Sequence, residues 1–147
     1  MGTSWLDDFV TAWILHPHAG SAEGARSLSD LLAFMSPTVR YEDVPTKQVL
    51  LGHAGVEDMC KRAYEWSADL EFRVLTAQSN GSMYAFEHEG SGTNTTALGS
   101  LPATGRHFVI RGVSVGTISA GGLVEEHRDY WDLASFLEQI GALPTLG

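Results

Sequence analysis

Apolar side chains follow a helical period through much of the first half of the chain. They recur every three or four positions over residues 4–15, and similar spacing returns over residues 27–35 and 55–66. This spacing places the apolar residues on one face of a helix. We therefore expect three helices there, with a break at residues 16–20, a first strand at residues 38–43, and a loop from there through Gly52.

The second half of the chain shows a different pattern. β-Branched and aromatic residues alternate with polar ones, and turn residues separate the segments, which is typical of antiparallel strands. The expected strands are residues 71–78, 83–89, 107–118 and 123–131, with a strand end plus a loop over residues 90–105 and a closing helix over residues 133–140. Helices that precede a meander predict an α+β fold with helices on one face of the sheet.

Composition narrows the possible partners. The chain has 147 residues and a net charge of −9, with no cluster of Lys or Arg, so we expect one domain over residues 1–147 that binds neither nucleic acid nor an anionic membrane. Cys60 is the only cysteine, which excludes an intrachain disulfide, and no Cys/His spacing resembles a zinc site. The N-terminal sequence lacks the basic and apolar regions of a signal peptide. We expect a soluble, cytoplasmic protein.

Titratable groups stand beside large aromatic rings in residues 123–132. Alternate side chains of an extended segment share a face, so His127, Asp129 and Trp131 point the same way. A carboxylate held against apolar groups loses hydration, its pKa rises, and it can act as a proton shuttle near neutral pH. The alternative is a solvated strand edge, where charges oppose aggregation.

Two segments resemble known families. Residues 92–106, Gly-Thr-Asn-Thr-Thr-Ala-Leu-Gly-Ser-Leu-Pro-Ala-Thr-Gly-Arg, are similar to the Gly-Thr-His-Thr-Gly...Gly-Pro-Thr-Gly-Arg segment of SnoaL-like polyketide cyclases. Residues 121–132 support this, and they also resemble the Gly-Lys-Ile...Arg-Asp-Tyr-Phe-Asp strand of limonene-epoxide hydrolases, which share the same fold. Both segments occur in the right order in a chain of the right length. The chain is identified as a member of the nuclear-transport-factor-like superfamily.

The resemblance implies a cone-shaped, curved antiparallel sheet wrapped round a deep apolar pocket, with N-terminal helices closing one side. Members of the superfamily are often dimers, so a homodimer is expected. Both families move protons without a cofactor or a covalent intermediate, using a buried carboxylate. Their functional aspartate lies on the strand before the last helix, and the matching residue here is Asp129.

Other matches are partial. Tyr41 and Asp43 stand where the epoxide hydrolases have a Tyr and an Asn that position the attacking water. Glu87 and Glu89 are the best match to an Arg and an Asp on a middle strand of the hydrolases, so the cation is missing. Asn94 replaces the His of the SnoaL-like segment and is expected to bind the substrate. The chain therefore lacks the full set of functional residues of either family.

The residues suggest roles for a proton-transfer site. Asp129 would take or deliver the proton, and a nearby Glu87, Glu89 or Asp43 would raise its pKa, because two carboxylates in one dry site resist double ionisation. His127 would polarise a carbonyl or relay a proton. Tyr41 would donate a hydrogen bond to a developing oxyanion.

The sequence leaves open which face of the strand at residues 83–89 lines the pocket. Either Glu87 and Glu89 face inward, or these two are solvated and Phe86 and His88 face inward, which is slightly favoured. Trp131 would shape the pocket and exclude water beside Asp129. Four further histidines show no partner pattern and are interpreted as incidental: His16, His18, His53 and His107.

The leading interpretation is an acid/base enzyme of SnoaL-like type. Its substrate would be a small, apolar, oxygenated molecule of polyketide, terpenoid or steroid type, and the reaction an aldol cyclisation, isomerisation or dehydration. One alternative is epoxide hydrolysis, in which Asp129 protonates the epoxide oxygen while Asp43 and Tyr41 position the water. The other is a non-catalytic ligand-binding or dimerisation module, since fold alone does not imply function.

Overall fold

A single curved sheet carries the fold in the computed structural model, which describes residues 4–144. The helices are α1 (Trp5–Ile14), α2 (His16–Ala19), α3 (Ala25–Ala33), α4 (Gly52–Trp66) and α5 (Leu133–Gln139). The strands are β1 (Met35–Asp43), β2 (Gln48–Leu51), β3 (Glu71–Ser79), β4 (Met83–Thr93), β5 (His107–Ile118) and β6 (Val124–Trp131). Residues 1–3 and 145–147, at the two ends of the expected domain, lie outside the described part.

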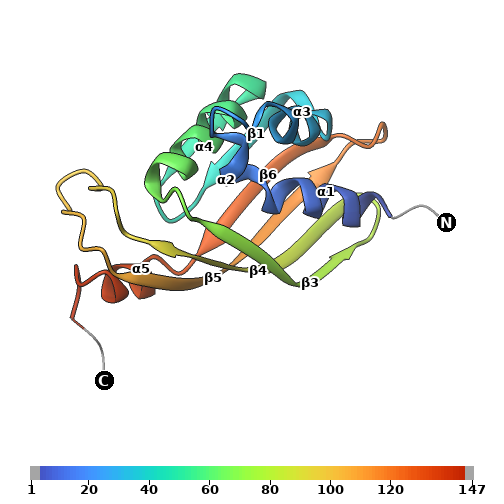
Figure 1. The fold of residues 1–147 in the computed structure, drawn as a ribbon. Coiled ribbons are helices and arrows are strands. Elements are labelled where there is room, and N and C mark those ends of the chain that lie inside the picture. The colour runs from blue at the N-terminus through green and yellow to red at the C-terminus, as the bar shows by residue number, and fades with distance from the viewer. Residues whose placement is uncertain (1–3, 145–147) are drawn as a thin grey trace.

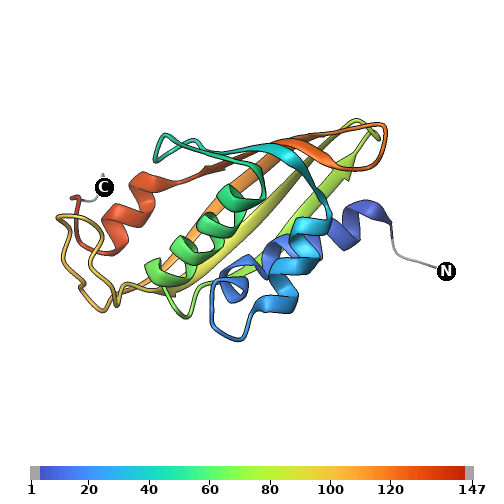
Figure 2. The same cartoon turned by 90° about the horizontal axis from the view of Figure 1, so that it is seen from above.

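The first four helices lie on one face of the sheet, as expected (Figure 1). Seen from above, α4 crosses the sheet between α5 at one end and α1 to α3 at the other (Figure 2). This arrangement of helices over a curved sheet is the α+β fold expected from the sequence. None of the helices in residues 4–144 has the length and apolar character needed to cross a bilayer.

The strand order is β2-β1-β6-β5-β4-β3. Every neighbouring pair is antiparallel, as expected, except β1 and β6, which run parallel. The parallel register pairs Tyr41 with His127 and Asp43 with Asp129. Two segments far apart in sequence are thereby brought side by side, and this pairing assembles the site described below.

Two short elements were not expected, because four residues are too few to show a period. Helix α2 forms within the expected break, with Pro17 in its first turn, where the missing N–H of proline costs nothing. Strand β2 forms within the expected loop and pairs with β1 at the edge of the sheet. Strand β1 also begins at Met35, before Pro37, and its register on β6 shifts between Met35 and Arg40. A proline is tolerated at such an irregularity.

The longer elements agree closely with their expected positions. Strand β5 has the expected bounds, while β4 continues four residues further, to Thr93. The sequence pattern did not reveal this extension, because Gly90 and Gly92 have no side chain that could show the alternation of a strand. Gly90 makes room for the ring of Phe72, whose nearest carbon would lie 2.7 Å from a Cβ at that position.

The buried core has two parts. The larger part joins the buried face of α1, including Phe9 and Trp13, to the inner face of the sheet. The smaller part gathers residues of β5 and α5, such as Phe108 and Phe136, at the other end of the sheet. A cavity is bounded by residues of both parts.

Candidate active site

An apolar cavity of about 400 Å³ lies between α1, α4, α5 and the inner face of the sheet. Aromatic side chains form much of its wall, including Trp13, Trp66 and Trp131. Arg62 also borders it, and its side chain is 51% exposed, so this part of the wall reaches the surface. A cavity of this size and character fits a small apolar molecule.

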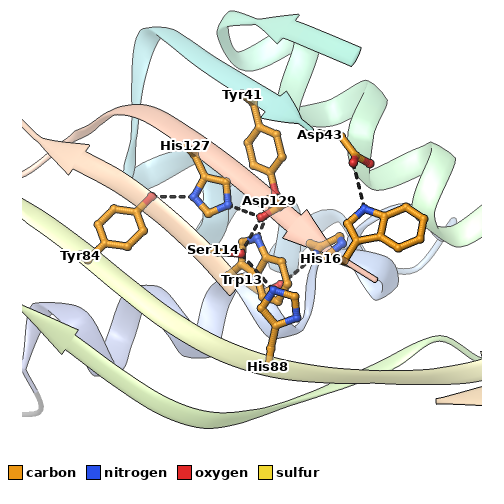
Figure 3. Close-up of polar contacts among 10 residues, drawn as sticks. Trp13, His16, Tyr41, Asp43, Tyr84, His88, Ser114, His127 and Asp129 are labelled. Atoms are coloured by element: carbon orange, nitrogen blue, oxygen red, sulfur yellow. Dashed lines mark hydrogen bonds and ion pairs between the residues drawn. The ribbon is translucent and has the colours of Figure 1, made fainter. Parts of the chain in front are cut away.

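Asp129 lies in the wall of this cavity, and its side chain is 13% exposed. Its Oδ2 accepts a hydrogen bond of 2.5 Å from the Tyr41 hydroxyl. Its Oδ1 accepts one of 2.6 Å from the Ser114 hydroxyl and lies 2.6 Å from Nε2 of His127 (Figure 3). A carboxylate has about four lone pairs for acceptance. Three contacts therefore leave Asp129 able to accept one more, from a bound molecule.

The environment of Asp129 keeps it ionised. Burial by itself raises the pKa of this carboxyl, but the His127 ring and the hydrogen bonds from His127, Ser114 and Tyr41 outweigh burial and hold the pKa well below its usual range. The expectation of a raised pKa is therefore wrong. The pKa is lowered instead because the side chain in direct contact with Asp129 is a histidine and not a second carboxylate.

His127 is fully buried and lies behind Asp129, away from the cavity wall. Because a carboxylate only accepts, Nε2 of His127 carries the hydrogen that it donates to Asp129. Its Nδ1 lies 2.6 Å from the Tyr84 hydroxyl. His127 thus contacts a cavity ligand only through Asp129, so the expected polarisation of a carbonyl by this ring does not fit its position, whereas a proton relay through Asp129 does.

Tyr41 is oriented by two partners. Trp13 donates from Nε1 to the Tyr41 hydroxyl at 2.9 Å, and that hydroxyl donates in turn to Asp129. The Tyr41 ring stacks on His127 at 4.4 Å between centroids. Burial and the charge of Asp129 raise the pKa of Tyr41 well above its usual value. Its proton is therefore directed at Asp129, which makes Tyr41 a positioning residue rather than the expected oxyanion donor.

Asp43 supplies a second carboxyl group to the cavity, from the strand next to Asp129. Its Oδ1 accepts a hydrogen bond of 2.9 Å from Nε1 of Trp131. Burial, aided by the charge of Asp129, raises the pKa of Asp43 even though the bond from Trp131 opposes this. Two carboxyl groups whose environments push their pKa values apart form a natural pair of base and acid.

Two histidines complete the polar wall. His88 faces inward, as the favoured alternative expected, and its Nε2 lies 3.1 Å from the Ser114 hydroxyl oxygen. His16 also lines the cavity, and its Nδ1 lies 2.7 Å from the carbonyl oxygen of Trp13. Burial lowers the pKa of each ring to about 4. The interpretation of His16 as incidental is not supported by this position. No local pattern indicated this role, because His16 follows the break after α1.

The two glutamates of β4 lie on the opposite face of the sheet. Glu87 accepts a hydrogen bond of 2.8 Å from Thr76, and Glu89 pairs with Arg73 at 2.9 Å and with Arg111 at 3.6 Å. These contacts with strands β3 and β5 hold both carboxylates at the outer surface. They do not act on Asp129, so the alternative in which they line the pocket is wrong.

Phe86 and Asn94 are also outside the cavity. Phe86 faces inward but lies in the core against Trp13, at 5.1 Å between ring centroids. Asn94 organises the loop after β4, because its Oδ1 accepts hydrogen bonds of 2.7 and 3.1 Å from the backbone and hydroxyl of Thr104. Both were expected to bind substrate, and both instead have structural contacts.

Within residues 4–144, no three His, Cys, Asp or Glu side chains are grouped so that they could share a metal ion.

Solved structures share this fold. A protein of Jannaschia sp. CCS1, provisionally named a SnoaL-like polyketide cyclase, is 18% identical, with a TM-score of 0.73 over 98% of this chain and 99% of that one. TsrD of Streptomyces laurentii is 22% identical, with a TM-score of 0.78 over 97% and 99%. A protein of Catenulispora acidiphila with a ketosteroid isomerase-like fold, in complex with trimethylamine, is 17% identical, with a TM-score of 0.74 over 94% and 95%. At these identities the likeness establishes the fold alone.

Sequence comparison adds the family. No curated protein matches the chain. The sequence model of the SnoaL-like domain, in contrast, matches residues 18–127, which span most of the chain and include β1 to β5 and the first half of β6. The chain therefore belongs to the SnoaL-like domain family.

Proposed function

We propose that the chain is an acid/base enzyme that moves a proton on a small, apolar, oxygenated molecule held in the cavity, without a cofactor. The observation that carries this proposal is the ionised Asp129, which is enclosed by three hydrogen-bond donors and still faces the cavity. A carboxylate so placed is preorganised to accept a proton from a bound molecule.

The two carboxyl groups suggest how the proton moves. Asp129 accepts the proton from a carbon next to a carbonyl group, so the C–H bond breaks and an O–H bond forms on the aspartate. Asp43, in its protonated form, gives a proton to the carbonyl oxygen, and the product is an enol. The enol can then attack a second carbonyl, take a proton at another carbon, or expel a hydroxyl group. These outcomes are aldol cyclisation, isomerisation and dehydration.

The low pKa of Asp129 restricts which C–H groups of a substrate it can deprotonate. A weak base removes protons efficiently only from acidic carbons, because general-base catalysis depends on the difference between the two pKa values. A carbon between two carbonyl groups is such a position. The proposal therefore favours a β-dicarbonyl substrate of polyketide type over a simple ketosteroid.

Epoxide hydrolysis fits the geometry less well. That reaction needs a water positioned by Tyr41 and Asp43 with Asp129 as the acid. Here the Tyr41 hydroxyl donates to Asp129, and the low pKa of Asp129 makes it a poor acid at neutral pH. We therefore do not propose hydrolysis.

A proton-exchange assay tests the proposal. The protein is incubated in D₂O with β-keto polyketide mimics, a Δ5-ketosteroid and a panel of epoxides, and hydrogen exchange and turnover are followed. We expect exchange at the carbon between the carbonyls, about 10²- to 10⁴-fold slower in Asp129→Asn. Glu125→Gln, an exposed change on the same strand, is the matched control and should have no effect. Exchange that survives in Asp129→Asn would contradict the role of Asp129, and its absence with all substrates would favour a ligand-binding module.

A further inference from the structure

The hydrogen-bond partner of His16 fixes which of its nitrogens carries hydrogen. Nδ1 lies 2.7 Å from the carbonyl oxygen of Trp13, and a carbonyl oxygen can only accept. Nδ1 is therefore the protonated nitrogen of the neutral ring. Nε2 carries a lone pair, on a ring that lines the cavity.

A chain of donors fixes the tautomer of His88 in the same way. The ionised Asp129 only accepts, so the single hydroxyl hydrogen of Ser114 is donated to it. Ser114 must then accept the hydrogen on Nε2 of His88, which leaves Nδ1 of His88 with a lone pair. Among the residues that the structure describes, this Nδ1 is the buried side-chain nitrogen without a hydrogen-bond partner. An unpaired buried acceptor costs free energy, and a donor on a ligand would recover it.

Both rings lie at the same end of the cavity. His16 and His88 each pack against Trp13, at 4.7 and 4.5 Å between ring centroids, and both contact Phe72, at 5.1 and 5.5 Å. Asp129 lies against this group through Ser114 and the Tyr41 hydroxyl that Trp13 binds. The polar atoms that line this end of the cavity are acceptors: the imidazole lone pair of His16 and a carboxylate oxygen of Asp129, with the buried lone pair of His88 beside them.

These acceptors determine which kind of polar group on a ligand can bind at this end of the cavity. A carboxylate or a ketone oxygen would meet lone pairs and a negative charge, which repel it. An ammonium group would be attracted by Asp129, but it would lose its hydration inside an otherwise apolar cavity, which costs far more than burial of a neutral donor. A neutral donor, such as a phenolic or enolic hydroxyl, avoids both costs.

We propose that His16 accepts a hydrogen bond from a hydroxyl group on the substrate, so that this end of the cavity selects rings that carry a free hydroxyl; the buried Nδ1 of His88 becomes a second acceptor when ligand binding uncovers it. The inference rests on the proposed function only in taking this cavity as the substrate site. It gives the bound molecule an orientation, with a hydroxyl toward the two histidines and a carbonyl toward Asp43.

Binding of matched naphthalene probes tests this selection without any turnover. The probes are 2-naphthol, 2-methoxynaphthalene, 2-naphthoate and 2-(aminomethyl)naphthalene, and affinity is measured by fluorescence at neutral pH. We expect 2-naphthol to bind about 3- to 10-fold more tightly than its methyl ether, which is the effect of one net hydrogen bond. Equal affinity for these two probes, or tighter binding of the carboxylate or the ammonium compound, overturns the proposal.

Variants assign the selection to particular rings. His16→Phe keeps the ring shape but removes the acceptor, and it should abolish most of the preference for 2-naphthol; His88→Phe should reduce it further. His18→Phe, on the same short helix but exposed, should keep the wild-type preference. A preference that is unchanged in His16→Phe contradicts the assignment.

Nitrogen NMR keeps the test independent of whether these variants fold. In the unmodified protein, long-range ¹⁵N–¹H spectra should show hydrogen on Nδ1 of His16 and on Nε2 of His88. Addition of 2-naphthol should move the resonance of the bare Nε2 of His16, whereas 2-methoxynaphthalene should not. The opposite tautomer of His16, or no movement, overturns the proposal. The two proposals fail separately: exchange that survives in Asp129→Asn contradicts the proposed function, whereas the probe affinities and the spectra of the unmodified protein test this inference alone.

Discussion

Replacement of Tyr41 by Phe removes one oxygen atom from the centre of the buried network. Two contacts are lost: the 2.5 Å bond to Asp129 and the 2.9 Å bond that Trp13 donates. A hydrogen bond to a charged group contributes about 1.5–3 kcal/mol, so its loss should increase the affinity of Asp129 for a proton by about 10- to 100-fold. The pKa of Asp129 therefore rises in Tyr41→Phe.

The same change should lower stability. Nε1 of Trp13 becomes a buried donor without an acceptor, and together with the lost bond to Asp129 this should reduce the free energy of unfolding by about 2–4 kcal/mol. The effect depends on pH with a defined sign. Because the folded-state pKa of Asp129 lies below the unfolded value, its contribution is complete above about pH 4 and is lost as the pH falls. The stability difference between variant and wild type should therefore shrink on acidification.

Two measurements check this prediction. Urea unfolding at several pH values gives the stability difference, and ¹³C NMR of the Asp129 carboxyl gives its titration directly. Tyr130→Phe is the matched control, since Tyr130 adjoins Asp129 in β6 but is 45% exposed on the other face. If the Asp129 carboxyl titrates at the same pH in Tyr41→Phe as in the wild type, the reasoning about this hydrogen bond is refuted.

Two further substitutions test the acid and the packing of the site. Trp131→Phe removes the donor to Oδ1 of Asp43, a bond that favours the ionised form, so the pKa of Asp43 should rise further and the alkaline fall of the exchange rate should move to higher pH. A pH profile that is unchanged would exclude Asp43 as the acid. Gly112→Ala places a Cβ 2.6 Å from Cε1 of His88 and from a backbone oxygen, and should cost about 1–3 kcal/mol in thermal unfolding. Gly121→Ala meets nothing closer than 3.8 Å and should be neutral by the same measurement.

Sequence patterns predicted the elements that are long and strictly periodic. Helix α1 was predicted to within a residue at each end; Ser4, which the pattern placed inside the helix, is instead its N-cap and accepts a hydrogen bond from the backbone N–H of Asp7. The parallel pairing of β1 with β6 was not predicted. It depends on how distant segments meet rather than on any local period, and it determines where Asp43 and Tyr41 stand relative to Asp129.

The candidate site was predicted unevenly for a similar reason. Asp129 and Tyr41 lie within segments that resemble known families, so both could be named in advance. Ser114 and His16 could not, because a serine inside a strand and a histidine after a helix break have no pattern of their own. Their importance arises from hydrogen bonds to Asp129 and to the Trp13 carbonyl, which only the folded chain shows.

The inner face of β5 presents Gly112, Ser114 and Gly116 at alternate positions, and the glycines leave space for the rings of His88 and Tyr84. In the sequence, residues 112–116 match the motif Gly-x-Ser-x-Gly, which marks the serine nucleophile of α/β-hydrolases. That nucleophile requires a sharp turn between a strand and a helix, whereas Ser114 lies in the middle of a strand, fully buried. A motif search would thus classify this chain as a serine hydrolase, yet its serine should resist fluorophosphonate labelling.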